Sequence, residues 1–181
     1  MFSFGKVGYS KPSIVKKRPL KFRNKSLDFL EALNEGNIPL VIMSAAPGDM
    51  IREYLDFEKR LYPNIHIIAN FFIFKGRKAV GVRETIIHSH NKHETEIKTL
   101  PIYKQLLKRR NVLLLGDNYE DTGMIQGFPY NNLIKIGFLN ENIEQNLEQY
   151  KEAYDVVITN DGDFTYINQL LKRLTPSPPP H

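Results

Sequence analysis

Short apolar runs alternate along this chain with segments whose apolar residues recur at helical spacing, and this alternation restricts the fold more than any other feature of the sequence. Strands are predicted at residues 38–43, 65–68, 112–115, 133–139 and 155–159, with a hairpin over 71–82. Helices are predicted near residues 26–35, 50–59, 99–110, 143–150 and 166–174. Strands that alternate with helices are typical of α/β proteins. We therefore predict an α/β fold built on a doubly wound parallel sheet.

The two ends of the chain differ in composition from its body. Residues 1–25 contain eight basic residues and no acidic one, and the last seven residues are rich in proline. The net charge of +5 therefore belongs to the N-terminal arm, since the rest of the chain has 17 basic and 20 acidic residues. This distribution argues against a nucleic-acid-binding body. We expect an irregular basic arm over 1–24, a core over 25–174 and a flexible tail over 175–181.

Several classes of protein and site are disfavoured by composition. The chain has no cysteine, which excludes disulfides and thiolate metal sites and suits a reducing compartment. No apolar run approaches the roughly 18 residues that a membrane span requires, and the N-terminus shows no secretory pattern. We expect a cytoplasmic protein without a membrane partner; its oligomeric state does not follow from the sequence.

In parallel sheets, ligands bind beyond the carboxyl ends of the strands, so polar residues just after each predicted strand are candidates for function. Ser44 follows one strand and precedes Ala45 and Ala46. A hydroxyl and free backbone N–H groups at such a position suit an anion such as phosphate. An ordinary turn serine is the alternative. Asn70 stands at a second strand end.

The loop over residues 87–93 contains three histidines and Lys92. The histidines suggest zinc, but no cysteine accompanies them, and we favour Lys92 as a point charge for phosphate. A solvated lysine is the alternative. Further along, Gly116-Asp117 closes an apolar run, and Asp121 follows four residues later. Two carboxylates at this spacing suit a Mg²⁺ site. A turn with capping aspartates is the alternative.

Taken in order, the serine, the lysine and the Gly-Asp-x-x-x-Asp pattern resemble the haloacid dehalogenase superfamily, and within it the cytosolic pyrimidine 5′-nucleotidases. The similarity is carried by Asn37–Ala45, Ile87-His88, Asn91-Lys92-His93, Asn111–Asp117, Leu133–Asn140, Tyr150 and Tyr154–Val157. It implies a Mg²⁺-dependent hydrolase of nucleoside monophosphates in the cytoplasm. Ser44, Ala45 and Lys92 would bind the substrate phosphate, Asp117 would ligate Mg²⁺, and Lys92 and Asp121 would assist catalysis.

The same resemblance implies a nucleophilic aspartate in an Asp-x-Asp-x-Thr motif, on a strand lying between the serine strand and the Gly-Asp strand. Upstream of Ser44 the only aspartate is Asp28, within a predicted helix. The helical cap that reads the base is also missing, unless residues 1–24 are a remnant of it. The sequence also departs from the family pattern at Ala46, Pro47 and Glu120, where a glycine, a small aliphatic residue and a glycine are usual. This core is therefore expected to be incomplete on its N-terminal side.

One downstream segment, Asp161-Gly162-Asp163-Phe164-Thr165, does match the motif. Asp161 is thus a candidate for a relocated nucleophile, but we favour an acidic turn that opens the last helix. Two functions remain open. The first is a 5′-nucleotidase whose activity is impaired in this chain, and the second is a non-catalytic phosphatase-like module that binds a phosphorylated ligand or a partner protein.

Overall fold

The computed structural model describes residues 22–84, 86–87 and 97–175, in which strands and helices alternate as predicted. The elements, in chain order, are α2 (Ser26–Glu35), β1 (Leu40–Pro47), α3 (Gly48–Phe57), β2 (Ile65–Asn70), β3 (Phe72–Lys75), β4 (Lys78–Val82), η2 (Ile97–Thr99), α4 (Tyr103–Leu106), β5 (Asn111–Gly116), η3 (Tyr119–Ile125), β6 (Asn132–Leu139), α5 (Ile143–Ala153), β7 (Val156–Thr159) and α6 (Thr165–Leu174). No described helix has the length and apolar character needed to cross a membrane.

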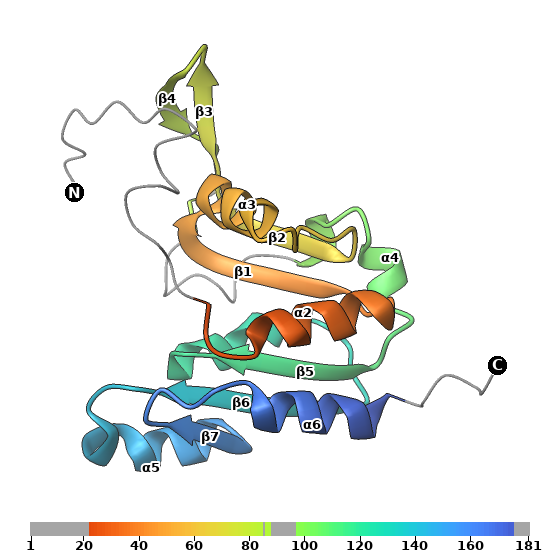
Figure 1. Ribbon diagram of the computed structural model, residues 1–181, viewed down its shortest axis with the longest axis vertical. Coiled ribbons are helices and arrows are strands. Elements are labelled where there is room, and N and C mark those ends of the chain that lie inside the picture. The colour runs from red at the N-terminus through yellow and green to blue at the C-terminus, as the bar shows by residue number, and fades with distance from the viewer. Residues whose placement is uncertain (1–21, 85, 88–96, 176–181) are drawn as a thin grey trace.

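The parallel strands lie in two separate sheets and not in one continuous sheet (Figure 1). β1 pairs with β2, and β5, β6 and β7 pair in that order, all in parallel. β3 and β4 form an antiparallel hairpin that projects from the body. The fold is therefore α/β with parallel sheets, as predicted, with its strands divided into a pair and a triplet.

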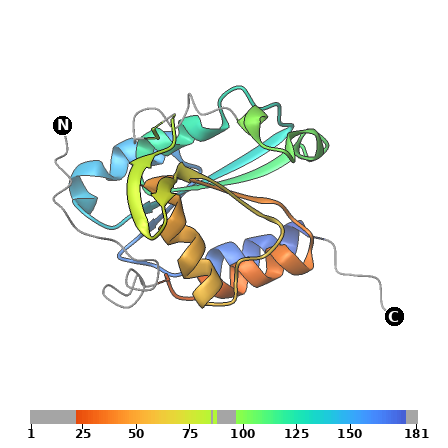
Figure 2. The ribbon, with the colours of Figure 1, turned by 90° about the horizontal axis from the view of Figure 1, so that it is seen from above.

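Helices cover both faces of these strands (Figure 2). On one face, α2, α3 and α6 share a buried apolar cluster with β6, which includes Phe29, Leu55, Ile136 and Ile167. On the other face, Tyr150 and the following Tyr154 pack against Leu114 of β5 and Leu139 of β6. The first cluster also touches apolar residues of β1 and β5, so it connects the two sheets.

Some element boundaries differ from the sequence prediction for local reasons. The helix predicted over 99–110 is divided into η2 and the short α4 by Pro101, whose ring prevents a continuous helix. β1 extends to Pro47 through a register shift after Met43, so Ser44 lies within an irregular strand end and not in a loop. α2 begins after Lys25, whose backbone is left-handed and whose side chain makes no capping hydrogen bond.

Residues 22–24, which the sequence assigned to the basic arm, lie against the core in the structure. The ring of Phe22 lies 6.2 Å from that of Tyr54. The guanidinium of Arg23 lies 4.4 Å from the centre of the Phe138 ring. The rest of the arm lies outside the described residues.

Candidate functional site

Ser44 and Asp117 stand at the carboxyl ends of β1 and β5, and these ends point to the same side of the molecule (Figure 1). The strands of each sheet are parallel, so the loops that follow them gather along one edge. This edge is where an α/β protein binds ligands. It brings together two of the segments that the sequence identified.

The Ser44 segment is held by its own side chain and by β2. The Ala46 N–H donates to Ser44 Oγ over 3.1 Å, and Asn70 Nδ2 donates to the Ala45 carbonyl over 2.8 Å. Gly48 begins α3 next to Phe71, where a Cβ atom would come within 2.6 Å of the ring. The serine hydroxyl still has a proton to donate, because it serves as acceptor in the bond from Ala46.

Asn70 connects the Ser44 segment to the chain that leads toward Lys92. Its Oδ1 accepts from the Ile87 N–H and its Nδ2 donates to the Ile87 carbonyl, both over 2.7 Å. Together with the bond to Ala45, one amide side chain thus fixes two chain segments. The position of Asn70 at a strand end was noticed in the sequence, but this bridging role was not predicted.

The loop after β5 is organised by Asp121, which is only 2% exposed. Its Oδ2 accepts from the N–H groups of Asp117 (3.1 Å) and Asn118 (3.2 Å), and Asn118 in turn caps η3. Gly116 is required here, since a Cβ atom would lie 2.7 Å from that of Asp121. Asp121 therefore positions the backbone of Asp117; its part in catalysis stays a prediction.

Two tyrosines hold the same loop from behind. Tyr150 Oη donates to the Asp117 carbonyl over 2.7 Å, and Tyr154 Oη donates to the Asn118 carbonyl. Burial, reinforced by the negative charges of Asp117 and Asp121, raises the pKa of Tyr150. Burial, and after it the charge of Asp121, also raises the pKa of Tyr154. Both hydroxyls thus stay protonated as donors at neutral pH.

Asp161 lies away from this loop. It follows β7, which pairs only with β6 among the described strands, so β7 and β5 are about 10 Å apart. Its carboxylate, 87% exposed, pairs with Arg23 over 2.8 Å. Asp163 Oδ1 accepts from the Thr165 N–H at the start of α6, and the Thr165 side chain and backbone lower the pKa of Asp163. This geometry favours the acidic-turn interpretation over a relocated nucleophile.

Lys92 and the three histidines beside it lie outside the described residues. Within the described part of the chain, no three histidine or acidic side chains are grouped as a metal site. Asp117 offers a carboxylate at the end of β5, whereas Oδ2 of Asp121 already accepts two backbone N–H groups. One or two carboxylates suffice for Mg²⁺ when water and phosphate complete its shell. The described residues therefore supply one carboxylate ligand for Mg²⁺, that of Asp117, and so fit the ion in part.

Known proteins are similar to this chain in sequence and in fold. Residues 9–175 match the model of the pyrimidine 5′-nucleotidase (UMPH-1) family. A 7-methylguanosine phosphate-specific 5′-nucleotidase of Mus musculus is 36% identical over 81% of this chain, and that of Homo sapiens is 34% identical over 89%. A solved structure of cytosolic 5′-nucleotidase IIIB bound to cytidine superposes with a TM-score of 0.77, at 28% identity over 83% of this chain.

The match covers only part of each of these proteins. It includes 49% of the mouse protein, 54% of the human protein and 51% of the chain in the solved structure. The chain thus spans about half the length of the curated relatives it matches. The matched residues nevertheless include α2 to α6 with both parallel sheets. The chain therefore belongs to the pyrimidine 5′-nucleotidase (UMPH-1) family, within the haloacid dehalogenase type of fold.

Proposed function

We propose that this chain provides the phosphate-binding and metal-binding half of a cytoplasmic 5′-nucleotidase, a phosphohydrolase of nucleoside monophosphates. Ser44 Oγ and the Ala45 N–H donate to phosphate oxygens, and Lys92 offsets their negative charge. Asp117 holds Mg²⁺, and Asp121 fixes the loop that carries Asp117. When bound, Mg²⁺ offsets the charge that develops as an anionic nucleophile approaches the phosphate.

One observation supports this proposal most directly. Ser44 and Asp117 lie at the carboxyl ends of two strands that point to the same side. The carbonyl of Ala45, next to Ser44, accepts from Asn70 of β2, and the Asp117 carbonyl accepts from Tyr150 of α5. The names of the relatives suggest the substrate class, because they include 7-methylguanosine phosphate and a cytidine complex. A pyrimidine or methylated purine monophosphate is therefore the first substrate to test.

The chain alone is expected to turn over substrate feebly. No Asp-x-Asp-x-Thr motif precedes Ser44, so charge stabilisation is retained without a covalent route. In serine proteases, removing the nucleophile leaves roughly 10³–10⁴-fold acceleration over water, which sets the scale of the residual activity expected here.

A second function is phosphate binding without catalysis. It is favoured because two nearby carboxylates already accept hydrogen bonds from backbone N–H groups. Asp49 Oδ2 accepts from the Phe72 N–H over 2.7 Å, and Asp121 accepts from two N–H groups of the β5 loop. Both carboxylates therefore have structural tasks. A module of this kind would bind a phosphorylated ligand through Ser44 and Lys92.

The experiment uses the purified chain with UMP, CMP or 7-methyl-GMP in the presence of Mg²⁺. Phosphate release and the protection of the fold against heat are measured for wild type, Asp117→Asn and Asp161→Asn. Asp56→Asn is the matched control, because Asp56 is exposed near the end of α3, far from the β1 carboxyl end.

We expect heat protection by nucleotide that depends on Asp117, with weak or no phosphate release in all variants. Strong turnover that is lost in Asp161→Asn would establish Asp161 as the nucleophile and contradict the acidic-turn assignment. Turnover that needs Asp117 but not Asp161 would indicate direct attack by water or another nucleophile. The absence of both turnover and heat protection would refute the proposed function.

A further inference from the structure

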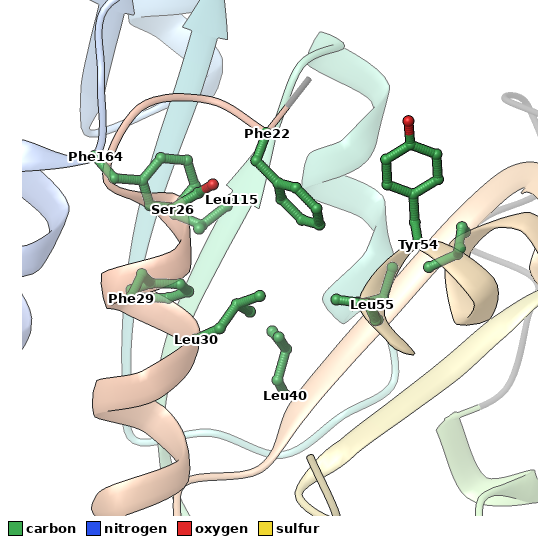
Figure 3. Close-up of a pocket in the computed structure, with 11 residues that line it drawn as sticks. Phe22, Ser26, Phe29, Leu30, Leu40, Tyr54, Leu55, Leu115 and Phe164 are labelled. Atoms are coloured by element: carbon green, nitrogen blue, oxygen red, sulfur yellow. The ribbon is translucent and has the colours of Figure 1, made fainter. Parts of the chain in front are cut away.

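The apolar cavity of about 320 Å³ between the two sheets is already accounted for. Leu40 of β1 and Leu115 of β5 line it, together with side chains of α2 and α3 (Figure 3). The family resemblance places a strand of the family's own core between β1 and β5. The charged surfaces that this strand does not explain lie elsewhere, on the β3–β4 hairpin and on α5 (Figure 1).

The tip of the β3–β4 hairpin is strongly basic. Lys75, Arg77 and Lys78, called here the basic tip, are exposed, and residues 71–83 contain no acidic residue. Lys75 and Lys78 stand directly opposite each other in the two strands. Like charges in such a pair destabilise a hairpin. No ion pair joins these three cations to another described residue. The stability of the hairpin therefore does not explain them.

The base of the hairpin is fastened to α3, so the basic tip is presented in a defined direction. Asp49 Oδ2, at the start of α3, accepts from the Phe72 N–H over 2.7 Å. The ring of Phe71 lies against Gly48, and the Phe71 carbonyl accepts from the Arg83 N–H over 2.9 Å. The tip projects from the body of the molecule (Figure 1).

The exposed face of α5 carries the opposite charge. Glu144, Glu148 and Glu152 are all exposed and follow one another at intervals of four residues. They therefore form one stripe along the helix, called here the acidic stripe, while Tyr150 packs toward the core. Like charges at this spacing destabilise a helix by about 0.2–0.5 kcal/mol per pair. Lys151 pairs with Glu148 over 2.7 Å, but it is one cation beside three carboxylates.

The basic tip and the acidic stripe lie at opposite ends of the long axis of the molecule (Figure 1). They therefore cannot meet within one copy of the chain, but they are available to two different copies. When the tip of one copy contacts the stripe of the next, a second tip and a second stripe stay exposed at the ends. Such head-to-tail contacts produce open chains or closed rings.

We propose that the basic tip of one copy docks on the acidic stripe of a second copy. Three cations that face three carboxylates are complementary in charge, and the contact relieves the repulsion within each surface. Each exposed ion pair contributes about 0.2–1 kcal/mol, and a hairpin tip on one helix face is a small contact. The association is therefore weak and sensitive to salt. It is independent of the proposed function, because no nucleotide takes part.

Sedimentation velocity of the full chain measures the association as the protein concentration rises, at about 0.02 M and about 0.5 M salt. We expect assemblies of more than one chain at low salt and single chains at high salt. The hairpin variant, Lys75→Glu with Lys78→Glu, should weaken the association about tenfold. The helix variant, Glu144→Lys with Glu152→Lys, should do the same. Circular dichroism checks that each variant is folded.

The matched control is Lys172→Glu with Arg173→Glu, at exposed positions of α6 outside both surfaces. It lowers the net charge by as much as the hairpin variant does, and it should associate as the wild type does. Lys75→Gln with Lys78→Gln removes the two charges without reversing them. This milder variant should lose less affinity than the hairpin variant.

Mixing the hairpin variant with the helix variant tests whether the two surfaces face each other. Neither variant associates well alone, but in the mixture the reversed tip meets the reversed stripe, and the association should return. General attraction between the variants does not produce this result. The substitutions change the net charge of +5 by four in opposite directions, to +1 and +9, so both variants stay positive.

Three outcomes would overturn the proposal. The first is a wild-type chain that stays single at low salt. The second is a hairpin variant that associates as tightly as the wild type, which would assign the acidic stripe to another basic segment, such as residues 1–25. The third is a mixture of the two variants that does not associate, because the basic tip and the acidic stripe would then not be partners.

Discussion

At the scale of single residues, Tyr154 supports the loop after β5, which belongs to the candidate site, from the buried side. The residue is 3% exposed and donates through its hydroxyl to the Asn118 carbonyl. Its ring occupies space left by Gly137, where a Cβ atom would lie 2.6 Å from Tyr154 Cδ2. The glycine in β6 therefore permits the tyrosine to reach the loop that follows β5.

Replacing Tyr154 by phenylalanine keeps the ring and removes the donor. The Asn118 carbonyl then loses its partner, and we expect the free energy of unfolding to fall by about 1–3 kcal/mol. Urea denaturation measures the change. Tyr166→Phe is the matched control, because Tyr166 is 47% exposed on α6 and should change stability little. A Tyr154→Phe chain as stable as the wild type would contradict this account of the loop.

The same tyrosines predict how stability depends on pH. Burial and nearby carboxylates raise the pKa values of Tyr150 and Tyr154 in the folded chain above the value of about 10 in the unfolded chain. Their contribution is complete below pH ~10, and it is lost as the pH rises above that value, because the unfolded chain then releases protons first. Denaturation at stepped alkaline pH should show this fall. The fall should be shallower in Tyr154→Phe.

At the scale of elements, local patterns predicted the strands and the longer helices, and tertiary contacts set their ends. They did not predict η3, and the helix predicted over 99–110 is interrupted at Pro101. The apolar spacing of Leu27, Phe29, Leu30 and Leu33 predicted α2 within its observed bounds. The register shift that lengthens β1 depends on its pairing with β2, which is not local in sequence. The positions of Ser44 and Asp117 followed from the strand-end rule. The three bonds of Asn70 did not, because an amide at a strand end has many partners available.

Asn70 supports a prediction at this scale, since it fastens the end of β1 to Ile87. Asn70→Ala removes one bond to Ala45 and two to Ile87, and we expect a loss of about 1–3 kcal/mol in stability. The exchange rate of the Ile87 amide should rise at the same time. Asn131→Ala is the control, because Asn131 is exposed just before β6. An unchanged Ile87 exchange rate would show that other contacts hold this segment.

At the scale of the whole molecule, the two sheets are joined by side chains and not by a strand ladder. The sequence predicted the strands themselves, but the partner of each strand is a non-local choice that its own residues do not specify. The apolar cluster of α2, α3, β6 and α6 supplies the connection. A two-stranded sheet is only marginally stable by itself. The β1–β2 pair should therefore depend on this cluster more than the β5–β6–β7 triplet does.

Leu33→Ala tests that dependence. Leu33 is 4% exposed and belongs to the cluster that contains Leu55 from the β1–β2 side and Ile167 from the other. Removing its buried methyl groups should cost about 2–5 kcal/mol. Leu174→Ala is the matched control, since Leu174 is 54% exposed at the end of α6.

Native-state hydrogen exchange distinguishes the two halves in this variant. In Leu33→Ala, amides of β1 and β2 should lose protection at lower denaturant concentration than those of β5 and β6. The reason is that the triplet keeps its ladder and the buried Ile136, whereas the pair keeps only its own two strands. Equal loss of protection in both sheets would mean that the molecule unfolds as a single unit, and that the β1–β2 pair is as stable as the β5–β6–β7 triplet.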